Sequence, residues 1–315
     1  MSHQRDGLTS RVSLEPGEYA TQYRQVYPIN PRRIFRHAAL SGLALLYKVA
    51  RQIPSVLERE RIQFLYLHHV FEDEEDSFRK LLELLLRNHH SISYSEAVER
   101  IWTGDIDKPY IVFSLDDGLK NCLRAARIMG EFGIKACFFL CVSIVGETDY
   151  YRIKEFCSSR LCQPPMEFLS WADVEALLHA GHEVGSHTMT HSNMAQLSME
   201  QIQAEVVESY KLLTQRVGDV KHFSWPLGRF FHITPTAVRT VFNTGFKSCA
   251  SAERGCHVIQ VDRQKLEQLC IRRNNVIAGW PPDHILYFMT KSSRMASRYD
   301  NQWPQGWSEI IERAF

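Results

Sequence analysis

Two pairs of polar residues in this chain have types and a spacing suited to holding a metal ion. Asp116 and Asp117 directly follow one apolar run, and His187 and His191 follow another. Asp117, His187 and His191 supply one oxygen and two nitrogen ligands, which leaves positions on a divalent ion open for water and substrate. Because three protein ligands are typical of a catalytic rather than a structural site, the pattern predicts a catalytic divalent metal.

Asp116 has a separate role in this interpretation. Consecutive residues that leave a strand point in different directions, so only one of the two carboxylates needs to face the metal. A free carboxylate beside a metal-activated water is a general base, and the chemistry indicated is hydrolysis of an amide or ester. Gly118 permits the tight turn after the carboxylates. Alone, Asp-Asp-Gly is a common turn or helix N-cap and His-x-x-x-His a common helical pattern, but their joint occurrence after two strands favours a metal site.

The elements that position these residues follow an alternating pattern. Short apolar runs alternate with segments of helical period, which predicts parallel strands joined by helices. Seven strands, mostly each followed by a helix, predict an α/β fold whose sheet is closed or nearly closed into a barrel, with an open doubly wound sheet as the competitor. In a barrel, reactive groups lie at the carboxyl ends of the strands. The predicted strands are 63–70, 110–115, 135–142, 181–186, 222–226, 244–249 and 270–276.

Length and composition limit the remaining possibilities. The chain has 315 residues, 44% of them hydrophobic, with a formal net charge of +1. The balanced charge argues against a nucleic-acid-binding protein, and eight cysteines without a C-x-x-C pair argue against a zinc ribbon or a disulfide framework. We expect a partly helical N-terminal extension at 1–62, one catalytic barrel at 63–292, and an irregular C-terminal tail at 293–315 that covers part of the barrel.

The N-terminal extension shows no secretory signal, which predicts a cytoplasmic protein. The apolar stretch 38–50 is too short to span a bilayer and is interrupted by Lys48. Arg32, Arg33 and Arg36 precede it. Two interpretations stay open: a helix that packs on the main domain, or a basic amphipathic helix that lies on the inner membrane face through residues 31–50.

Five ordered segments resemble the polysaccharide deacetylase family, the carbohydrate esterases that share the NodB homology domain (carbohydrate esterase family 4). Residues 114–118, Ser-Leu-Asp-Asp-Gly, are similar to the family's Thr-Phe-Asp-Asp-Gly motif, and 187–191 to its His-Ser/Thr-x-x-His motif. Residues 67–70 resemble a Tyr-His-x-Val segment, and 223–228 resemble Phe-Ala-Tyr-Pro-x-Gly. With the approach to the second motif at 169–187, the resemblance covers roughly residues 63 to 280.

The resemblance implies a distorted (β/α) barrel of about seven strands and the removal of an N-acyl group, usually acetyl, from an amino sugar in glycan or lipopolysaccharide biosynthesis. Asp116 would be the base that deprotonates the metal-bound water, while Asp117, His187 and His191 would hold zinc or a similar ion. Trp225, Pro226 and Leu227 would lie at the substrate, and the Leu227 backbone N–H would serve as the oxyanion donor.

Three departures from the family pattern affect these expectations. Ser224 stands where many members have an arginine that orients the base, and we hypothesise that Arg229 replaces it. The family's late Leu-x-His motif, the source of its general acid, has no clear counterpart, and His68 is the preferred replacement, with His284 and His257 as rivals. Secreted members carry a signal peptide or membrane anchor that is not evident here, which suggests a cytoplasmic sugar or a lipid-linked precursor as substrate.

Other functions stay open at this stage. A catalytically weak relative that binds glycan or protein would fit the missing arginine and histidine, and the three ligands alone also suit a deformylase, a peptide amidase or a phosphoesterase. Aromatic residues near the strand ends could stack on sugar rings, although core packing is the commoner role for such residues. They are Tyr150, Tyr151, Trp171, Trp225 and Trp280.

Overall fold

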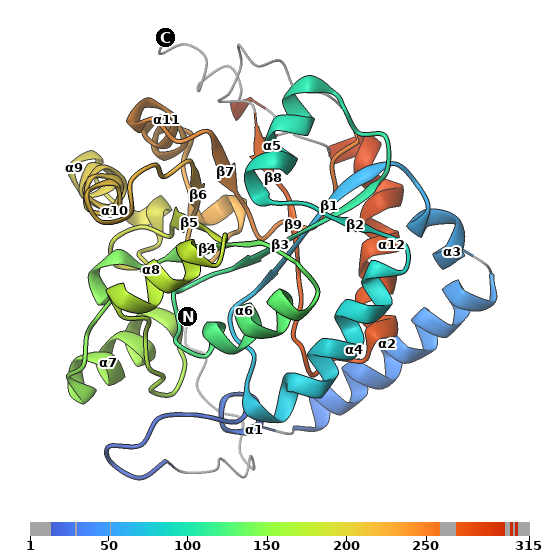
Figure 1. Cartoon of the computed structure of the whole chain (residues 1–315), viewed down its shortest axis with the longest axis horizontal. Helices are drawn as coiled ribbons and strands as arrows, with labels where there is room; N and C mark the ends of the chain where they lie inside the picture. Colours follow the sequence, from blue (N-terminus) through green and yellow to red (C-terminus); the bar gives the residue numbers. More distant parts are fainter. Residues whose placement is uncertain are drawn as a thin grey trace.

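Parallel strands lie at the centre of the molecule (Figure 1), and their pairing order brings them nearly into a closed ring. The computed structural model describes residues 14–28, 30–50, 52–258, 269–299, 303–304 and 306–307. The hydrogen-bonded order is β8-β7-β6-β5-β4-β3-β1-β9, and every pair along it is parallel. The strands are β1 (Arg61–Leu67), β3 (Pro109–Leu115), β4 (Ala136–Leu140), β5 (Glu183–Ser186), β6 (His222–Ser224), β7 (Ser248–Ala250), β8 (Cys270–Ile271) and β9 (Arg273–Asn275), with β2 (His90–Ser91) beside β3.

One segment closes the ring. Only Arg272 separates β8 from β9, yet β8 pairs with β7 and β9 pairs with β1. The wall of the barrel therefore consists of β1, β3, β4, β5, β6, β7 and the combined β8–β9 segment. This arrangement confirms the predicted α/β fold, a distorted barrel of about seven parallel strands, and excludes the open doubly wound sheet.

Helices cover the outside of the ring (Figure 1). Serine side chains cap several of them: Ser93, Ser170 and Ser198 each accept a hydrogen bond from the third residue of the helix that follows. Ser198 also forms a capping box with Gln201. The α-helices are α1 (Tyr23–Val26), α2 (Pro31–Val49), α3 (Gln52–Leu57), α4 (Glu75–Leu86), α5 (Tyr94–Thr103), α6 (Cys122–Glu131), α7 (Tyr150–Phe156), α8 (Trp171–His179), α9 (Met199–Gln203), α10 (Ser209–Val217), α11 (Pro235–Thr244) and α12 (Pro282–Tyr299).

Buried side chains form two cores. Alternate strand residues such as Phe64, Val112 and Phe139 pack with Tyr94 and other residues of α5. A larger core lies where the helices meet the strands. Since apolar burial is the main driving force of folding, these two cores fix the strand order and thereby the position of every strand end.

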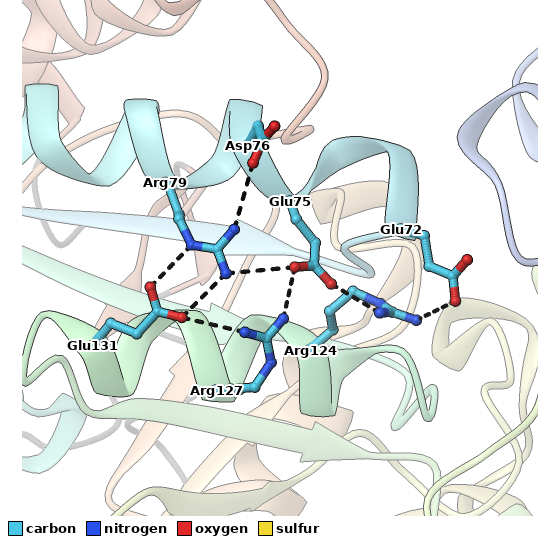
Figure 2. Close-up of polar contacts among 7 residues, drawn as sticks. All are labelled: Glu72, Glu75, Asp76, Arg79, Arg124, Arg127 and Glu131. Carbon is cyan, nitrogen blue, oxygen red and sulfur yellow. Dashed lines mark hydrogen bonds and ion pairs between the residues drawn. The ribbon is translucent and has the colours of Figure 1, made fainter.

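Ion pairs connect α4 to α6, the helix that follows the two aspartates (Figure 2). Arg79 Nε lies 2.9 Å from Glu131 Oε2, and Glu75 pairs with Arg124 at 2.8 Å and with Arg127 at 2.6 Å. Isolated surface pairs contribute little, but a network of this kind fixes the relative position of two helices more firmly.

Both predicted domain boundaries fall inside an element of the fold, and the one at 62/63 lies within β1, which begins at Arg61. The boundary at 292/293 falls inside α12, so residues 293–299 are helical, and the prediction of an irregular tail is wrong for them. The side chains of Ser292 and Ser293, on either side of the predicted boundary, are both buried. Beyond α12, Trp303 is buried and stacks on Trp225, while most of the predicted tail lies outside the described residues.

Candidate active site

Asp117, His187 and His191 come together at the carboxyl ends of β3 and β5. Their ligand atoms lie within 4.8 Å of one another, and all three residues are buried. Asp117 Oδ1 is 3.5 Å from Nε2 of His187 and 3.5 Å from Nε2 of His191. The three residues that the sequence proposes as metal ligands therefore converge on one point.

The hydrogen bonds of the two imidazoles indicate which nitrogen is free. His187 Nδ1 lies 2.7 Å from the carbonyl oxygen of Ser224, and His191 Nδ1 lies 3.1 Å from that of Arg160. Since a carbonyl only accepts, each Nδ1 carries a proton, and in the neutral ring Nε2 is the nitrogen that presents a lone pair. Burial lowers the pKa of His187 to about 4, so this ring is neutral at pH 7.

Asp117 Oδ1 has no hydrogen-bond partner among the residues that the structure describes, although it is buried. It faces two imidazole nitrogens that also present lone pairs. An arrangement of three electron-rich atoms without a proton between them is costly in a protein interior unless a cation neutralises it. The donor set, one carboxylate oxygen and two imidazole nitrogens, therefore fits a divalent ion such as Zn²⁺.

The three ligand residues lie in or next to turns with strained backbone conformations, which orient their side chains. Asp117 has φ 76°, Thr188 66° and His191 56°, all in the left-handed region that non-glycine residues seldom adopt. The His-x-x-x-His pattern thus forms a turn rather than a helix. The His191 N–H donates to Thr188 Oγ1 at 3.1 Å, and Glu205 accepts from the Thr190 N–H at 2.9 Å. Strain of this kind persists where surrounding contacts impose it, commonly at functional sites.

Asp116 has a different partner, Arg273 of β9. Arg273 Nη1 donates to Asp116 Oδ1 at 2.8 Å, and Nη2 donates to Oδ2 at 2.9 Å. The same guanidinium donates to Ser114 Oγ, Ser224 Oγ and the Ser251 carbonyl oxygen. Burial alone would raise the pKa of Asp116, but the Arg273 charge outweighs it and holds that pKa below its ordinary value. Asp116 is therefore ionised at neutral pH and locked in one orientation.

Arg273 corrects the hypothesis about Arg229. Arg229 pairs instead with Glu253 at 2.9 Å and is about half exposed, so it does not reach the base. Ser224, at the position of the family's arginine, accepts a hydrogen bond from Arg273 at 2.7 Å. The arginine that orients the base thus enters from the last strand of the barrel, next to β1, and the short Ser224 side chain leaves space for it.

A cavity of about 150 Å³ opens onto these groups. His68 lines it together with both aspartates and is only partly buried. His69 also lines it, but its Nε2 pairs with the Tyr27 hydroxyl at 3.1 Å and its Nδ1 lies 3.4 Å from Glu74. Among the candidate acids, His68 is therefore placed to meet a substrate.

The two rival histidines have structural positions. His257 is fully buried, and its Nε2 accepts from the Arg272 backbone N–H at 3.1 Å. His284 is buried beneath α2, 2.9 Å from Ser41 Oγ. Neither lines the cavity, so the structure brings neither to the aspartates.

The 225–228 turn forms another part of the cavity wall. Trp225 is fully buried, donates its indole N–H to the Arg229 carbonyl at 3.1 Å and stacks on Trp303, which leaves it little surface for a sugar. Leu227 is half exposed, has φ 63° and lines the cavity, whereas Pro226 is buried and is not among the lining residues.

Arg273 and Tyr27 are two residues of this site that sequence reasoning missed. Arg273 carried one signal, a charged residue inside an apolar run expected to be a barrel strand. Tyr27, which lines the cavity from the N-terminal extension, carried none, because it lies in a polar segment with no periodic pattern.

Comparison with known proteins agrees with this geometry. Residues 103–247 match the family model described as polysaccharide deacetylase, whereas no curated protein sequence matches. Similar solved structures include a polysaccharide deacetylase from Bacillus cereus (TM-score 0.57, 15% identity, 74% of this chain and 69% of that chain). They also include the deacetylase PplD of Streptococcus pyogenes in complex with acetate, with a TM-score of 0.56 and 17% identity. IcaB from Ammonifex degensii has a TM-score of 0.58 and 16% identity. Each of these two matches covers 73% of this chain and 98% of the other chain.

At these identities the solved structures establish a shared fold. The matched family model spans the strands that carry both aspartates and both histidines, and it confirms the resemblance seen in the motifs. Over residues 103–247, the chain therefore matches the polysaccharide deacetylase family.

Proposed function

We propose that this protein is a metal-dependent hydrolase that removes an N-acyl group, most simply acetyl, from an amino sugar during glycan or lipopolysaccharide biosynthesis. One observation carries the proposal: a buried, unpartnered carboxylate oxygen and two imidazole lone pairs lie beside a second carboxylate held ionised by Arg273. A metal-ligand set next to a separate base is the arrangement that metal-assisted amide hydrolysis requires.

A divalent ion on Asp117, His187 and His191 would polarise the acyl carbonyl and make water more acidic. Asp116 accepts the proton of the attacking water. Because Arg273 keeps Asp116 ionised, this carboxylate is available to accept a proton at neutral pH, although it is a weak base.

Other groups complete the reaction in this proposal. His68 donates a proton to the departing amine, since it lines the cavity and is partly open to solvent. Leu227 also lines the cavity, and its backbone N–H supports the developing oxyanion. Tyr27 and Trp225 line the cavity, and in this proposal they limit the access of bulk water.

The alternative of a catalytically weak relative loses one of its two arguments. It was based on a missing arginine and a missing late histidine, and Arg273 supplies the first. A lipid-linked form of the substrate, contact of residues 31–50 with a membrane, and a cytoplasmic location at the inner membrane face belong to the same proposal.

The experiment measures acyl release from N-acetylated and N-formylated amino-sugar oligosaccharides by protein loaded with Zn²⁺, before and after treatment with a chelator. We expect release by the wild type, loss with the chelator, and loss in His187→Ala. His179→Ala is the matched control, because His179 is an exposed histidine at the end of α8. Metal-loaded wild type that releases no acyl group from any of these substrates would favour the binding-module alternative.

A further inference from the structure

Helix α2 exposes a continuous apolar face to solvent. The exposed fractions of its large apolar side chains are unusually high: Phe35 78%, Val49 74%, Leu46 65%, Ile34 60%, Leu45 59% and Leu43 41%. At 100° per residue, these six side chains and Ala38, Ala39 and Gly42 between them occupy one arc of about 180°. Single exposed apolar residues are ordinary, but a contiguous face of this kind marks an interaction site.

The opposite face of α2 is fixed against α12, beside which α2 lies in Figure 1. His37 stacks on His284 with ring centroids 5.3 Å apart, and Tyr47 meets Tyr287 at 4.9 Å. Ser41 Oγ is 2.9 Å from His284 Nε2, and Ala44 is fully buried. The helix therefore cannot turn its apolar face inward without breaking this contact.

Cationic side chains border the exposed face. Residues 31–49 contain Arg32, Arg33, Arg36 and Lys48 and no acidic residue. On a helical wheel Arg32 and Arg36 lie at one margin of the apolar arc and Lys48 at the other. Lys48 is 63% exposed, and its 3.8 Å contact with Asp283 is a surface pair of little strength.

We infer that α2 is a docking element for an anionic lipid bilayer: it lies in the plane of the surface, with its apolar face among the upper acyl chains and its cations at the phosphates. An apolar face with flanking cations is the pattern of helices that lie on membranes. Within the described part of the chain, no helix is long and apolar enough to cross a membrane.

A second copy of the chain fits this face less well than a bilayer. A 19-residue helix is about 28 Å long and about 10 Å wide, so half its surface amounts to roughly 440 Å². A stable protein interface needs about 800 Å² from each partner. A bilayer has no such minimum, because the affinity grows with each apolar side chain inserted and each cation near the phosphates.

The docking helix begins beside the catalytic cavity. Tyr27, which lines the cavity, precedes the first residue of α2, Pro31, by only four positions. The Arg33 guanidinium lies 4.9 Å from the centre of the Tyr27 ring and its Nη1 is 3.4 Å from the Pro28 carbonyl oxygen. Docking would thus bring the cavity close to lipid headgroups. This position points to an amino sugar carried on a lipid as the substrate, an inference that rests on the proposed function.

Vesicle co-sedimentation tests the docking. The probes are vesicles of phosphatidylcholine alone and vesicles that also contain phosphatidylglycerol, and the protein is the full chain. We expect binding to the anionic vesicles that weakens as salt is raised. Phe35→Glu/Leu46→Glu should bind at least about tenfold more weakly, since two apolar side chains no longer insert. Arg32→Gln/Lys48→Gln should lose about fivefold in affinity per residue at low salt.

Tyr151→Glu is the matched control, because Tyr151 is 74% exposed on α7 rather than on α2. It should bind vesicles like the wild type, and the melting temperatures of all variants should agree. Absence of binding to anionic vesicles, or equal binding by Phe35→Glu/Leu46→Glu, would overturn the inference. So would a dimer in light scattering that this double variant dissociates, since the face would then join two copies.

Turnover separates this inference from the proposed function. Phe35→Glu/Leu46→Glu should retain the wild-type rate on a soluble N-acetylated amino-sugar oligosaccharide and lose at least about tenfold on an N-acetylglucosaminyl lipid in anionic vesicles. If the double variant matched the wild-type rate on both substrates, the inference of a lipid-linked substrate would be wrong, but the proposed reaction would be unaffected. Vesicle binding without turnover on either substrate would contradict the reaction and leave the docking intact.

Discussion

Replacing Arg273 with Met tests the most consequential contact in the site. Met keeps an unbranched chain of similar length but removes all of the guanidinium donors. Asp116 would then be a buried carboxylate without its two charge-assisted hydrogen bonds, at 2.8 and 2.9 Å, and without its counter-charge. Ser114 Oγ and Ser224 Oγ would each lose a donor as well.

The magnitude follows from these contacts. Hydrogen bonds to charged groups contribute about 1.5 to 3 kcal/mol each, and removal of one partner of a buried ion pair costs about 3 to 5 kcal/mol. We therefore expect Arg273→Met to lower the free energy of unfolding by about 3 to 5 kcal/mol. Turnover should fall at least about a hundredfold, because an unoriented base contributes little.

Urea denaturation of a double-mutant cycle measures this coupling. Asp116→Asn removes the buried charge, so Arg273→Met/Asp116→Asn should be less destabilised than the sum of the two single variants by about 2 kcal/mol. Arg229→Met is the matched control, because this arginine pairs with Glu253 at the surface and should cost less than about 1 kcal/mol. A loss below about 1 kcal/mol in Arg273→Met, or additivity in the cycle, would refute the assignment of Arg273 as the residue that positions the base.

Three further predictions concern the acid, the fold and the pH dependence. His68→Gln should keep its metal content and KM while kcat falls about a hundredfold, and an unchanged kcat would remove His68 as the acid. Gly228→Ala should lower the free energy of unfolding, measured in urea, by about 2 to 4 kcal/mol, because the added Cβ would lie 2.3 Å from Ala252 Cβ at a φ of 64°. Gly133 has a similar φ of 69° but open space around it, so Gly133→Ala should lower it by only about 1 to 2 kcal/mol. Equal losses in the two variants would refute the packing argument. Burial would raise the pKa of Glu183, but hydrogen bonds from His222 and Ser95 lower it from 4.5 to about 2. The ionised Glu183 therefore stabilises the folded state above pH 4.5, and this stabilisation is lost as the pH falls toward 2. Glu183→Gln should therefore be less stable than the wild type by up to about 3 kcal/mol near neutral pH, and a gap that does not shrink in acid would contradict this linkage.

The sequence was sufficient to predict the barrel and the converging ligands. Each predicted strand overlaps an observed one, because the alternation of β-branched apolar runs with helical periods is strong throughout the catalytic part of the chain. Asp117, His187 and His191 could be grouped because parallel strands bring their carboxyl ends to one face.

The remaining features depend on contacts that no local pattern encodes. Arg273 reaches Asp116 across 157 residues, and this pairing requires knowing that β9 closes the ring beside β1. The absence of long-range contacts from local patterns also explains the misplaced boundary at 292/293. It explains as well why the sequence left open whether α2 packs on the barrel or lies on a membrane. Periodicity shows that a helix has an apolar face, but only the position of α12 shows which face is covered.

Metal content and acyl release, measured together on the wild type, Asp116→Asn and Asp117→Asn, test the central claim most directly. We predict that Asp116→Asn keeps its Zn²⁺ and loses at least about a hundredfold in turnover, because it retains the three ligands and lacks the base. Asp117→Asn should lose both metal and turnover. Loss of metal from Asp116→Asn, or acyl release by it at the wild-type rate, would contradict the division of roles between the two aspartates.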